Sequence, residues 1–247
     1  NLFLDSFLNA INSKTKVIYL SHITSSTGLV FPIKEICEIA RNNNIMSIID
    51  GAHAPGQVEV DMLDINPDIY VGACHKWMCS PKGASFLYAN KRIQDLIDPL
   101  VISWGWESDA PGKSQFLDYH QYQGTNDVSA YLTIPEIVNF FKEHKWNKIQ
   151  KQCHSLILDF LKNNQEQLET CSTNPEHLAQ MLSFKVNKNS QLLKSIFKSP
   201  NGIIEAQNKI FDYNQIRIPI IIWNQEIFTR LSIQAYNKPE DIEKLLD

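Results

Sequence analysis

Four side chains able to do acid–base or nucleophilic chemistry fall into two short stretches. Asp50 and His53 belong to IIDGAHAPG, and His75 and Lys76 belong to GACHKWMCSPKG. Taken singly, each also has an ordinary role, since an aspartate before glycine caps turns and a lysine beside tryptophan is often a solvated amine. Taken together, a carboxylate, two imidazoles and an amine indicate nucleophilic or general acid–base catalysis.

The residues around these two stretches predict alternating strands and helices. Helical spacing of Ile33, Ile36, Cys37 and Ala40 predicts a helix, which the asparagines at 42–44 stop. Strands are predicted where apolar and β-branched residues run without a break, at 16–20, 45–49, 68–73 and 84–89. A strand, a helix and a strand in succession form the βαβ unit of a parallel sheet, so this half of the chain is expected to be α/β.

The chemical side chains directly follow the predicted strands. Because the loops after parallel strands meet in one crevice, residues 21–28, 50–55 and 74–80 are expected to lie at one sheet edge. The set there matches what pyridoxal phosphate needs, namely a lysine for a Schiff base and a carboxylate that keeps the pyridine nitrogen protonated. Lys76 and Asp50 supply these two groups.

These two stretches, with HITSSTGLVFPI at 22–33, resemble the class V aminotransferase family of fold-type I pyridoxal phosphate enzymes. Within it they are closest to the isopenicillin N epimerase-like branch, and the similarity runs in order over nearly the whole chain. It implies that Asp50 pairs with the pyridine nitrogen and that His53 faces the ring hydroxyl. It also implies that His75 binds the phosphate and that Lys76 forms the Schiff base.

The resemblance extends to three further residues. Thr125 in QGTNDVSAY would reach the phosphate of the neighbouring subunit's cofactor, which implies a homodimer; the residues after it predict a helix start that favours phosphate. Arg230 in TRLSIQAYN would fork onto the carboxylate of an amino acid substrate, although a surface ion pair is its other role. Ser25 stands where many relatives carry asparagine and is included as a cofactor contact.

The second half of the chain predicts a smaller domain. We expect a long helix or helix pair over 134–167, a strand at 181–186, an apolar stretch at 216–223, a strand at 229–235 and helices at 191–198 and 239–246. The fold class is therefore α/β, with a mostly parallel large domain in residues 1–133 and an interdomain helix with a small α+β domain in 134–247. Residue 1 is Asn and 2–11 predict an amphipathic helix, so an N-terminal part that completes the phosphate site is expected to be missing.

Composition narrows the partners. Among 247 residues, 43% are hydrophobic, and 23 basic against 27 acidic residues give a net charge of −4. With no long basic run and no stretch near the roughly 20 apolar residues of a membrane span, neither nucleic acid nor membrane is expected as a partner. Five scattered cysteines indicate reduced thiols in the cytoplasm.

The reaction type stays open among transamination, epimerisation and C–S elimination, since Lys76 can serve each as acid and base at Cα. No cysteine lies between Cys171 and Arg230, which disfavours the persulfide chemistry of cysteine desulfurases. Trp104 and Trp106 either line the substrate pocket or simply pack.

The whole chain also admits three other interpretations. A metal hydrolase could use Asp50, His53, Cys74, His75 and Cys79, but their spacing is not zinc-like. The others are a catalytically inactive scaffold of the same fold and an incomplete enzyme with weak cofactor affinity.

Overall fold

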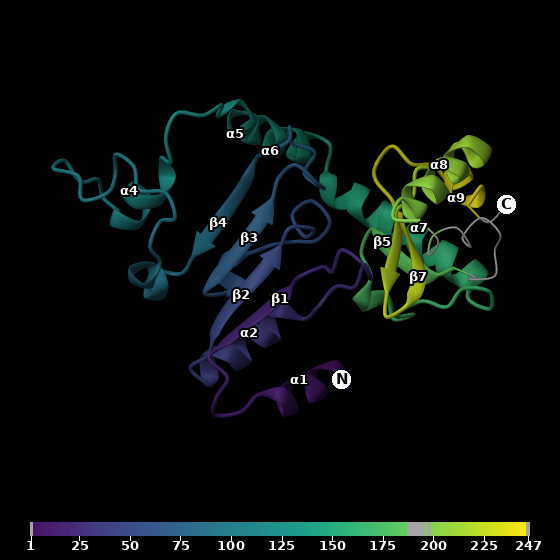
Figure 1. The fold of residues 1–247 in the computed structure, drawn as a ribbon, viewed down its shortest axis with the longest axis horizontal. Helices are drawn as coiled ribbons and strands as arrows, with labels where there is room; N and C mark the ends of the chain where they lie inside the picture. The colour runs from purple at the N-terminus through teal and green to yellow at the C-terminus, as the bar shows by residue number, and fades with distance from the viewer. Residues whose placement is uncertain (1, 187–195, 197–198, 246–247) are drawn as a thin grey trace. The chain divides into compact units, whose positions relative to one another are not determined.

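A computed structural model describes residues 2–186, 196 and 199–245 (Figure 1). The chain divides into two compact units that alternate along the sequence. The first unit comprises residues 1–22, 32–55 and 60–139, and the second comprises 23–31, 56–59 and 140–247. Two short segments from the first half of the chain, 23–31 and 56–59, therefore belong to the second unit.

A four-stranded sheet is the main element of the first unit. Its strands follow chain order, β1 (Val17–Ser21), β2 (Met46–Gly51), β3 (Ile69–Ala73) and β4 (Ser85–Ala89). β1, β2 and β3 are parallel, and β4 pairs antiparallel with β3. The predicted α/β class with a mostly parallel sheet is confirmed, and the carboxyl ends of β1, β2 and β3 share one edge.

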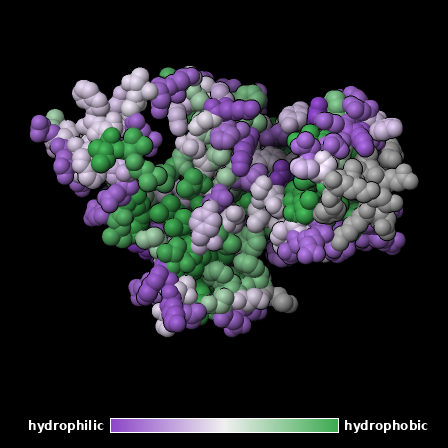
Figure 2. All heavy atoms as spheres, in the orientation of Figure 1, coloured by the Kyte–Doolittle hydropathy of each residue, from purple (hydrophilic) through white to green (hydrophobic). Residues whose placement is uncertain are grey.

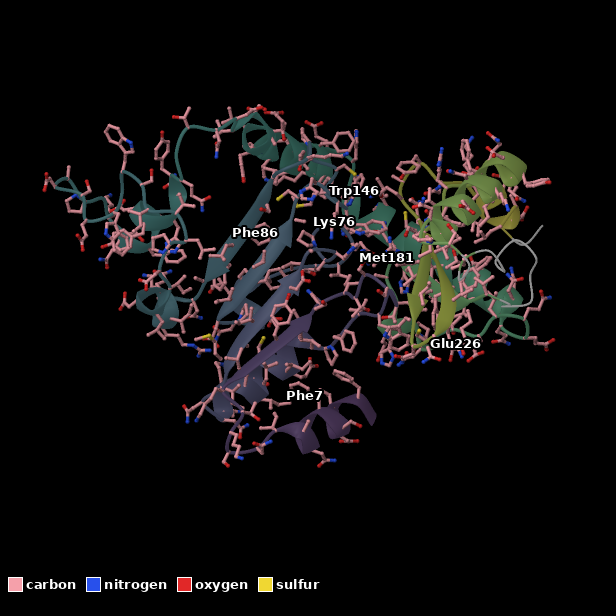
Figure 3. All side chains as sticks on the ribbon, in the orientation of Figure 1. Phe7, Lys76, Phe86, Trp146, Met181 and Glu226 are labelled. Atoms are coloured by element: carbon pink, nitrogen blue, oxygen red, sulfur yellow. The ribbon has the colours of Figure 1, made fainter. Side chains whose placement is uncertain are left out.

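One face of this sheet is covered by helices. α2 (Ile33–Asn42) packs Ile36 and Ala40 against Ile18 and Ile45. α1 (Leu2–Ala10), predicted as amphipathic from its spacing, adds partly buried side chains to the same core, including Phe7 (Figure 3). The asparagines after α2 end it as predicted, with Asn44 in the left-handed conformation at φ 52°.

The other face of the sheet is largely uncovered. Val17 and Tyr19 of β1, Val71 of β3 and Leu87 of β4 are exposed, whereas their neighbours within the strands are buried or half-buried, and Tyr19 is 69% exposed. Figure 2 shows hydrophobic residues gathered over these strands. Parallel sheets are normally covered on both faces, so this face is suited to contact with further polypeptide.

The first unit ends in a long segment of short helices. These are η1 (Lys91–Leu96), α4 (Gln115–Gln121) and α5 (Ser129–Leu132), whereas the short α3 (Met62–Ile65) lies earlier, between β2 and β3. Between residues 96 and 132, large apolar side chains are exposed, among them Leu96, Leu100, Trp104, Leu117 and Leu132. The helix expected after Thr125 is only the four-residue α5.

The second unit is a small α+β domain, as predicted. Its antiparallel sheet has the order β5-β7-β6, formed by β5 (Met181–Lys185), β6 (Ile220–Trp223) and β7 (Glu226–Ser232). Its helices are α7 (Trp146–Asn164), η2 (Pro175–His177), α8 (Gly202–Asn214) and α9 (Pro239–Glu243). α7 packs Ile157 and Phe160 onto Leu182 and Leu231 of the sheet.

Several predicted elements differ in detail. The region 134–167 is a helix pair, α6 (Ile134–Glu143) and α7, broken where Lys145 adopts φ 52°. The strand predicted at 229–235 is β7, which begins and ends earlier because it pairs with β6 from Glu226. α8 was not predicted, and the helix expected at 191–198 lies outside the described residues except for Ile196.

Candidate active site

The carboxylate of Asp50 lies at the carboxyl end of β2. Its Oδ1 accepts the backbone N–H of Ala52 at 2.9 Å, and its Oδ2 is 3.5 Å from the hydroxyl of Ser21 at the end of β1. A turn follows, closed by the N–H of Ala54, which donates to the carbonyl of Gly51 at 3.0 Å. This turn fixes His53 three residues beyond Asp50.

Backbone hydrogen bonds hold the loop after β3. The Cys74 N–H donates to the Ala84 carbonyl at 3.1 Å, and the Cys79 N–H donates to the Lys76 carbonyl at 3.1 Å. Cys79 adopts φ 60°, the left-handed conformation that this turn requires. Trp77 is only 9% exposed, so the loop is anchored immediately beside Lys76.

His53 connects the two loops. Its Nε2 lies 3.2 Å from Nζ of Lys76, and its Nδ1 accepts the indole N–H of Trp77 at 3.1 Å. Figure 3 shows Lys76 at the edge where the parallel strands end. The structure therefore brings His53 and Lys76 into direct contact beside the strand end that carries Asp50.

His75 is held by its own loop. Its Nδ1 lies 3.0 Å from the carbonyl oxygen of Ala84. A carbonyl only accepts hydrogen bonds, so Nδ1 carries the hydrogen and Nε2 is the nitrogen left for a ligand.

A buried polar pair below this edge was not singled out from the sequence. Nδ1 of His22 lies 2.9 Å from the hydroxyl of Tyr70. Burial lowers the pKa of His22 to about 4, and burial followed by the charge of Asp50 raises the pKa of Tyr70. Both groups are therefore neutral at physiological pH. The one feature of the sequence that could have indicated this pair is the position of His22 at the end of a predicted strand.

Glycine makes room for the ring of Tyr70. A Cβ atom at Gly51 would lie 2.1 Å from that ring, closer than any real contact. Tyr70 also stacks on Phe86 of β4, with ring centroids 6.2 Å apart. The glycine after Asp50 is thus required by the close packing of the Tyr70 ring.

Arg230 and Ser25 lie in the second unit and contact each other. Nη1 of Arg230 donates to the carbonyl of Ser25 at 2.5 Å and lies 3.3 Å from its Oγ, while Nε donates to Ser232 at 3.2 Å. Burial lowers the pKa of Arg230. These bonds fix the guanidinium through uncharged groups, which is unlike the surface ion pair considered from the sequence.

Thr125 and the two tryptophans lie in the exposed part of the first unit. The hydroxyl of Thr125 is 3.4 Å from that of Tyr122. Trp106 packs on Tyr119 with ring centroids 4.4 Å apart, whereas Trp104 is 87% exposed.

Three further findings concern the described part of the chain. No three His, Cys, Asp or Glu side chains there are grouped so that they could hold a metal ion. None of its helices is long and apolar enough to cross a membrane. The five cysteines form no disulfide.

Residues 1–245 match the family described as Aminotransferase class-V, and the chain belongs to this family. Over 145 residues it is 36% identical to isopenicillin N epimerase of Streptomyces clavuligerus, covering 54% of this chain and 36% of that protein. Over 249 residues it is 27% identical to "Probable L-cysteine desulfhydrase, chloroplastic" of Arabidopsis thaliana, covering 95% of this chain and 50% of that protein. The family and the epimerase-like resemblance predicted from the motifs are confirmed.

The fold has known counterparts. A solved complex of the cystine C-S lyase C-DES with its reaction product cysteine persulfide matches with a TM-score of 0.75 at 22% identity, over 98% of this chain and 62% of that one. A mutant of C-DES with glycine covalently linked to its PLP cofactor gives a TM-score of 0.74 at 22% identity, with the same coverage. These matches confirm the fold, and the chain spans only 36% to 62% of the proteins named here.

Proposed function

We propose that this chain binds pyridoxal 5′-phosphate and acts at Cα of an amino acid with a free carboxylate. The observation that carries the proposal is the 3.2 Å distance between Nζ of Lys76 and Nε2 of His53, at the sheet edge where Asp50 ends β2. An amine, an imidazole and a carboxylate are the groups that the cofactor's aldehyde, ring hydroxyl and pyridine nitrogen need. The donor set therefore fits the cofactor, and membership of the family supports it.

The residues around the cofactor have separate tasks. Asp50 holds the proton on the pyridine nitrogen, because a nearby carboxylate favours the protonated base. His53 donates from Nε2 to the oxygen of the ring hydroxyl, and His75 presents Nε2 to the phosphate. When bound, the cofactor supplies an electron sink for negative charge at Cα.

Lys76 is the catalytic residue. Its Nζ would hold the cofactor covalently, and the free amine would take the proton from Cα and return it. Two features distinguish transamination, epimerisation and C–S lysis. They are the atom and face to which the proton is returned, and whether a group leaves from Cβ. The named relatives include an epimerase and a desulfhydrase, and the proposal covers both reactions.

Arg230 binds the substrate carboxylate. Its guanidinium presents a planar pair of donors that matches a carboxylate, and its bonds to Ser25 and Ser232 orient it before substrate arrives. Ser25 thereby has two roles. It orients Arg230, and it is the cofactor contact expected from the resemblance.

The active assembly is a homodimer in which Thr125 reaches the phosphate in the partner subunit. Support comes from the segment that carries Thr125, because its apolar side chains between residues 96 and 132 are exposed in this chain. Such side chains commonly mark protein interfaces. Because α5 has only four residues, its N-terminus is not counted as a phosphate-binding group. The contact with the phosphate is therefore made by the Thr125 hydroxyl and the neighbouring backbone.

We assign residues 1–133 to the cofactor-binding domain and 134–247 to the interdomain helix and the small domain. A reducing, cytoplasmic location is supported by five cysteines without a disulfide. The slightly acidic net charge of −4 supports a small-molecule substrate and not nucleic acid or a membrane.

The test is to add pyridoxal phosphate to the purified chain, then record the visible spectrum and the mass after borohydride treatment. The unchanged chain and Lys82→Ala, which alters an exposed lysine of the same loop, should gain a band and a covalently fixed cofactor. Lys76→Ala should gain neither. A band seen only in a version extended upstream of Asn1 supports the same role for Lys76. Without a band in either version, the enzyme proposal fails and the inactive scaffold remains.

A further inference from the structure

A groove in the second unit has no part in the function proposed above. Its volume is about 610 Å³, within the range of about 300–1,000 Å³ that is usual for small-molecule sites. Three parts of this unit line it, namely one face of α7, residues 57–59 and residues 178–179 just before β5. None of the residues assigned to cofactor or substrate is among them, so any ligand here is a second ligand.

Polar side chains of α7 form one wall of the groove. Asn147, Gln150, Lys151 and His154 recur three or four residues apart, which places them on one face of the helix. The buried side chains of α7, among them Ile157, belong to the hydrophobic core of the unit. The polar wall is therefore held in place by the packing of its own helix.

Hydrogen bonds fix the segment that forms the opposite wall. The indole N–H of Trp146, at the start of α7, donates to the carbonyl of Gly56 at 3.1 Å. The backbone N–H of Gln180 donates to Oε1 of Gln57 at 3.1 Å. The segment is thereby tied both to α7 and to the start of β5, so the groove exists before a ligand enters.

His154 brings a buried acceptor to this groove. Its Nε2 is buried and has no hydrogen-bond partner within the part of the chain that the structure describes. The Pro175 carbonyl bonds to the ring, and because a carbonyl only accepts, the other nitrogen, Nδ1, carries the hydrogen. Burial lowers the pKa of His154 more than this bond raises it, so the ring is neutral at physiological pH. Nε2 therefore presents a lone pair that needs a donor.

Two opposite charges lie on different walls. Glu59 belongs to the 57–59 segment and Lys151 belongs to α7, and both side chains are exposed. No ion pair joins them, and neither pairs with another described side chain. A carboxylate and an ammonium that are kept apart in one groove complement a ligand that carries both charges.

We propose that this groove binds a free α-amino acid. The ammonium of the ligand donates to Glu59 and to Nε2 of His154, and its carboxylate accepts from Lys151. Its side chain lies along Val58 and Leu178. A ligand with charge of one sign only would meet a like charge in the groove, and an apolar ligand would leave Nε2 without a donor. The inference goes beyond the proposed function, since it needs no cofactor.

The first measurement is nitrogen-15 NMR of the cofactor-free, histidine-labelled chain at constant pH, with His154→Gln assigning the signals. A nitrogen that presents a lone pair changes its shift when it accepts a hydrogen bond. L-leucine should therefore move the Nε2 signal of His154 saturably, with a dissociation constant of about 1 mM or lower. If the signal does not move, the groove holds water only and the proposal is wrong.

Two relatives of L-leucine test the orientation, because leucinol lacks the carboxylate and 4-methylpentanoic acid lacks the ammonium. Lys151→Met should weaken L-leucine about two- to fivefold and leave leucinol unchanged. Glu59→Gln should weaken L-leucine and leucinol by a similar factor, but not the acid. Lys148→Met, which changes an exposed lysine of α7 outside the groove, should alter none of the three affinities. Equal effects of a groove variant on all three ligands would overturn the proposal.

Arg230→Lys separates the groove from the proposed substrate site. In this variant the response of His154 to L-leucine should be unchanged. Loss of the response would assign the ligand to the substrate site and contradict the inference. Because the measurements use the chain without cofactor, failure here is distinct from failure of pyridoxal phosphate binding.

Discussion

Arg230 tests the proposed function at the scale of a single residue. Arg230→Lys keeps the positive charge but loses the planar fork that holds a carboxylate. We expect binding of an amino acid substrate analogue to weaken by about tenfold or more, while the cofactor band is unchanged. Titration of the band with the analogue measures both quantities.

Arg217→Lys is the matched control, because that guanidinium lies 3.8 Å from the ring centroid of Phe211 on the same unit. It should leave the affinity for the analogue unaltered. If Arg230→Lys abolishes the cofactor band, the residue belongs to cofactor binding and its assigned role is wrong.

Site residues could be predicted from the sequence where they belong to a recognisable motif. Asp50, His53 and Lys76 could be named because each follows a recognisable strand within a family motif. The partnership of His22 with Tyr70 spans 48 residues and depends on strand register, which no local pattern gives. The hydrogen-bond partner of each imidazole nitrogen was likewise invisible until the two loops were placed.

At the scale of elements, Asp68 joins three parts of the first unit. This buried carboxylate, just before β3, accepts the backbone N–H of Ser47 on β2 at 2.8 Å and pairs with Nε of Arg92 on η1 at 2.6 Å. Burial by itself would raise the pKa of Asp68, but the bonds from Arg92 and Ser47 outweigh it and lower the pKa. The ionised form is therefore the one that stabilises the fold.

The sign of the pH effect follows. Because the folded-state pKa of Asp68 lies below the unfolded value of about 3.9, its contribution is complete above that value and is lost as pH falls through the folded-state pKa. Asp68→Asn should lower the free energy of unfolding at neutral pH by about 1–3 kcal/mol and flatten its decline in acid. Urea unfolding at a series of pH values measures both, with exposed Asp95→Asn as the control. An unchanged acid slope in Asp68→Asn would contradict the assignment.

Elements were predictable where apolar runs or helical spacing mark them. The strands β1 to β4 and helix α2 follow such patterns closely. α8 was missed because the Ser-Pro-Asn-Gly sequence before it indicates a turn, and its packing on Ile220 and Ile227 is a tertiary contact. The break at Lys145 has neither glycine nor proline to announce it.

At the scale of the whole molecule, the proposed homodimer predicts complementation between variants. Thr125→Ala should bind cofactor more weakly, and Lys76→Ala should not form the covalent band. In a mixed dimer, one site combines the intact Lys76 of one subunit with the intact Thr125 of the other. Mixing the two variants should therefore create a class of tight sites that neither shows alone, measured by cofactor titration of the band.

The control mixes Thr125→Ala with a chain carrying both changes, which supplies no intact Thr125 and should restore nothing. Analytical ultracentrifugation gives the assembly state directly. A monomer at every concentration, or no gain on mixing, would rule out the shared site.

The alternation of the two units along the sequence governs the order in which the molecule can be completed during synthesis. The carbonyl of Ser26 and the side chain of Gln57 hold Ser183 and Gln180, at and beside β5. Gln57 precedes Gln180 by 123 residues, so at about 5–20 residues per second the ribosome delivers the partner about 6–25 s later. The second unit therefore closes only when most of the chain has emerged.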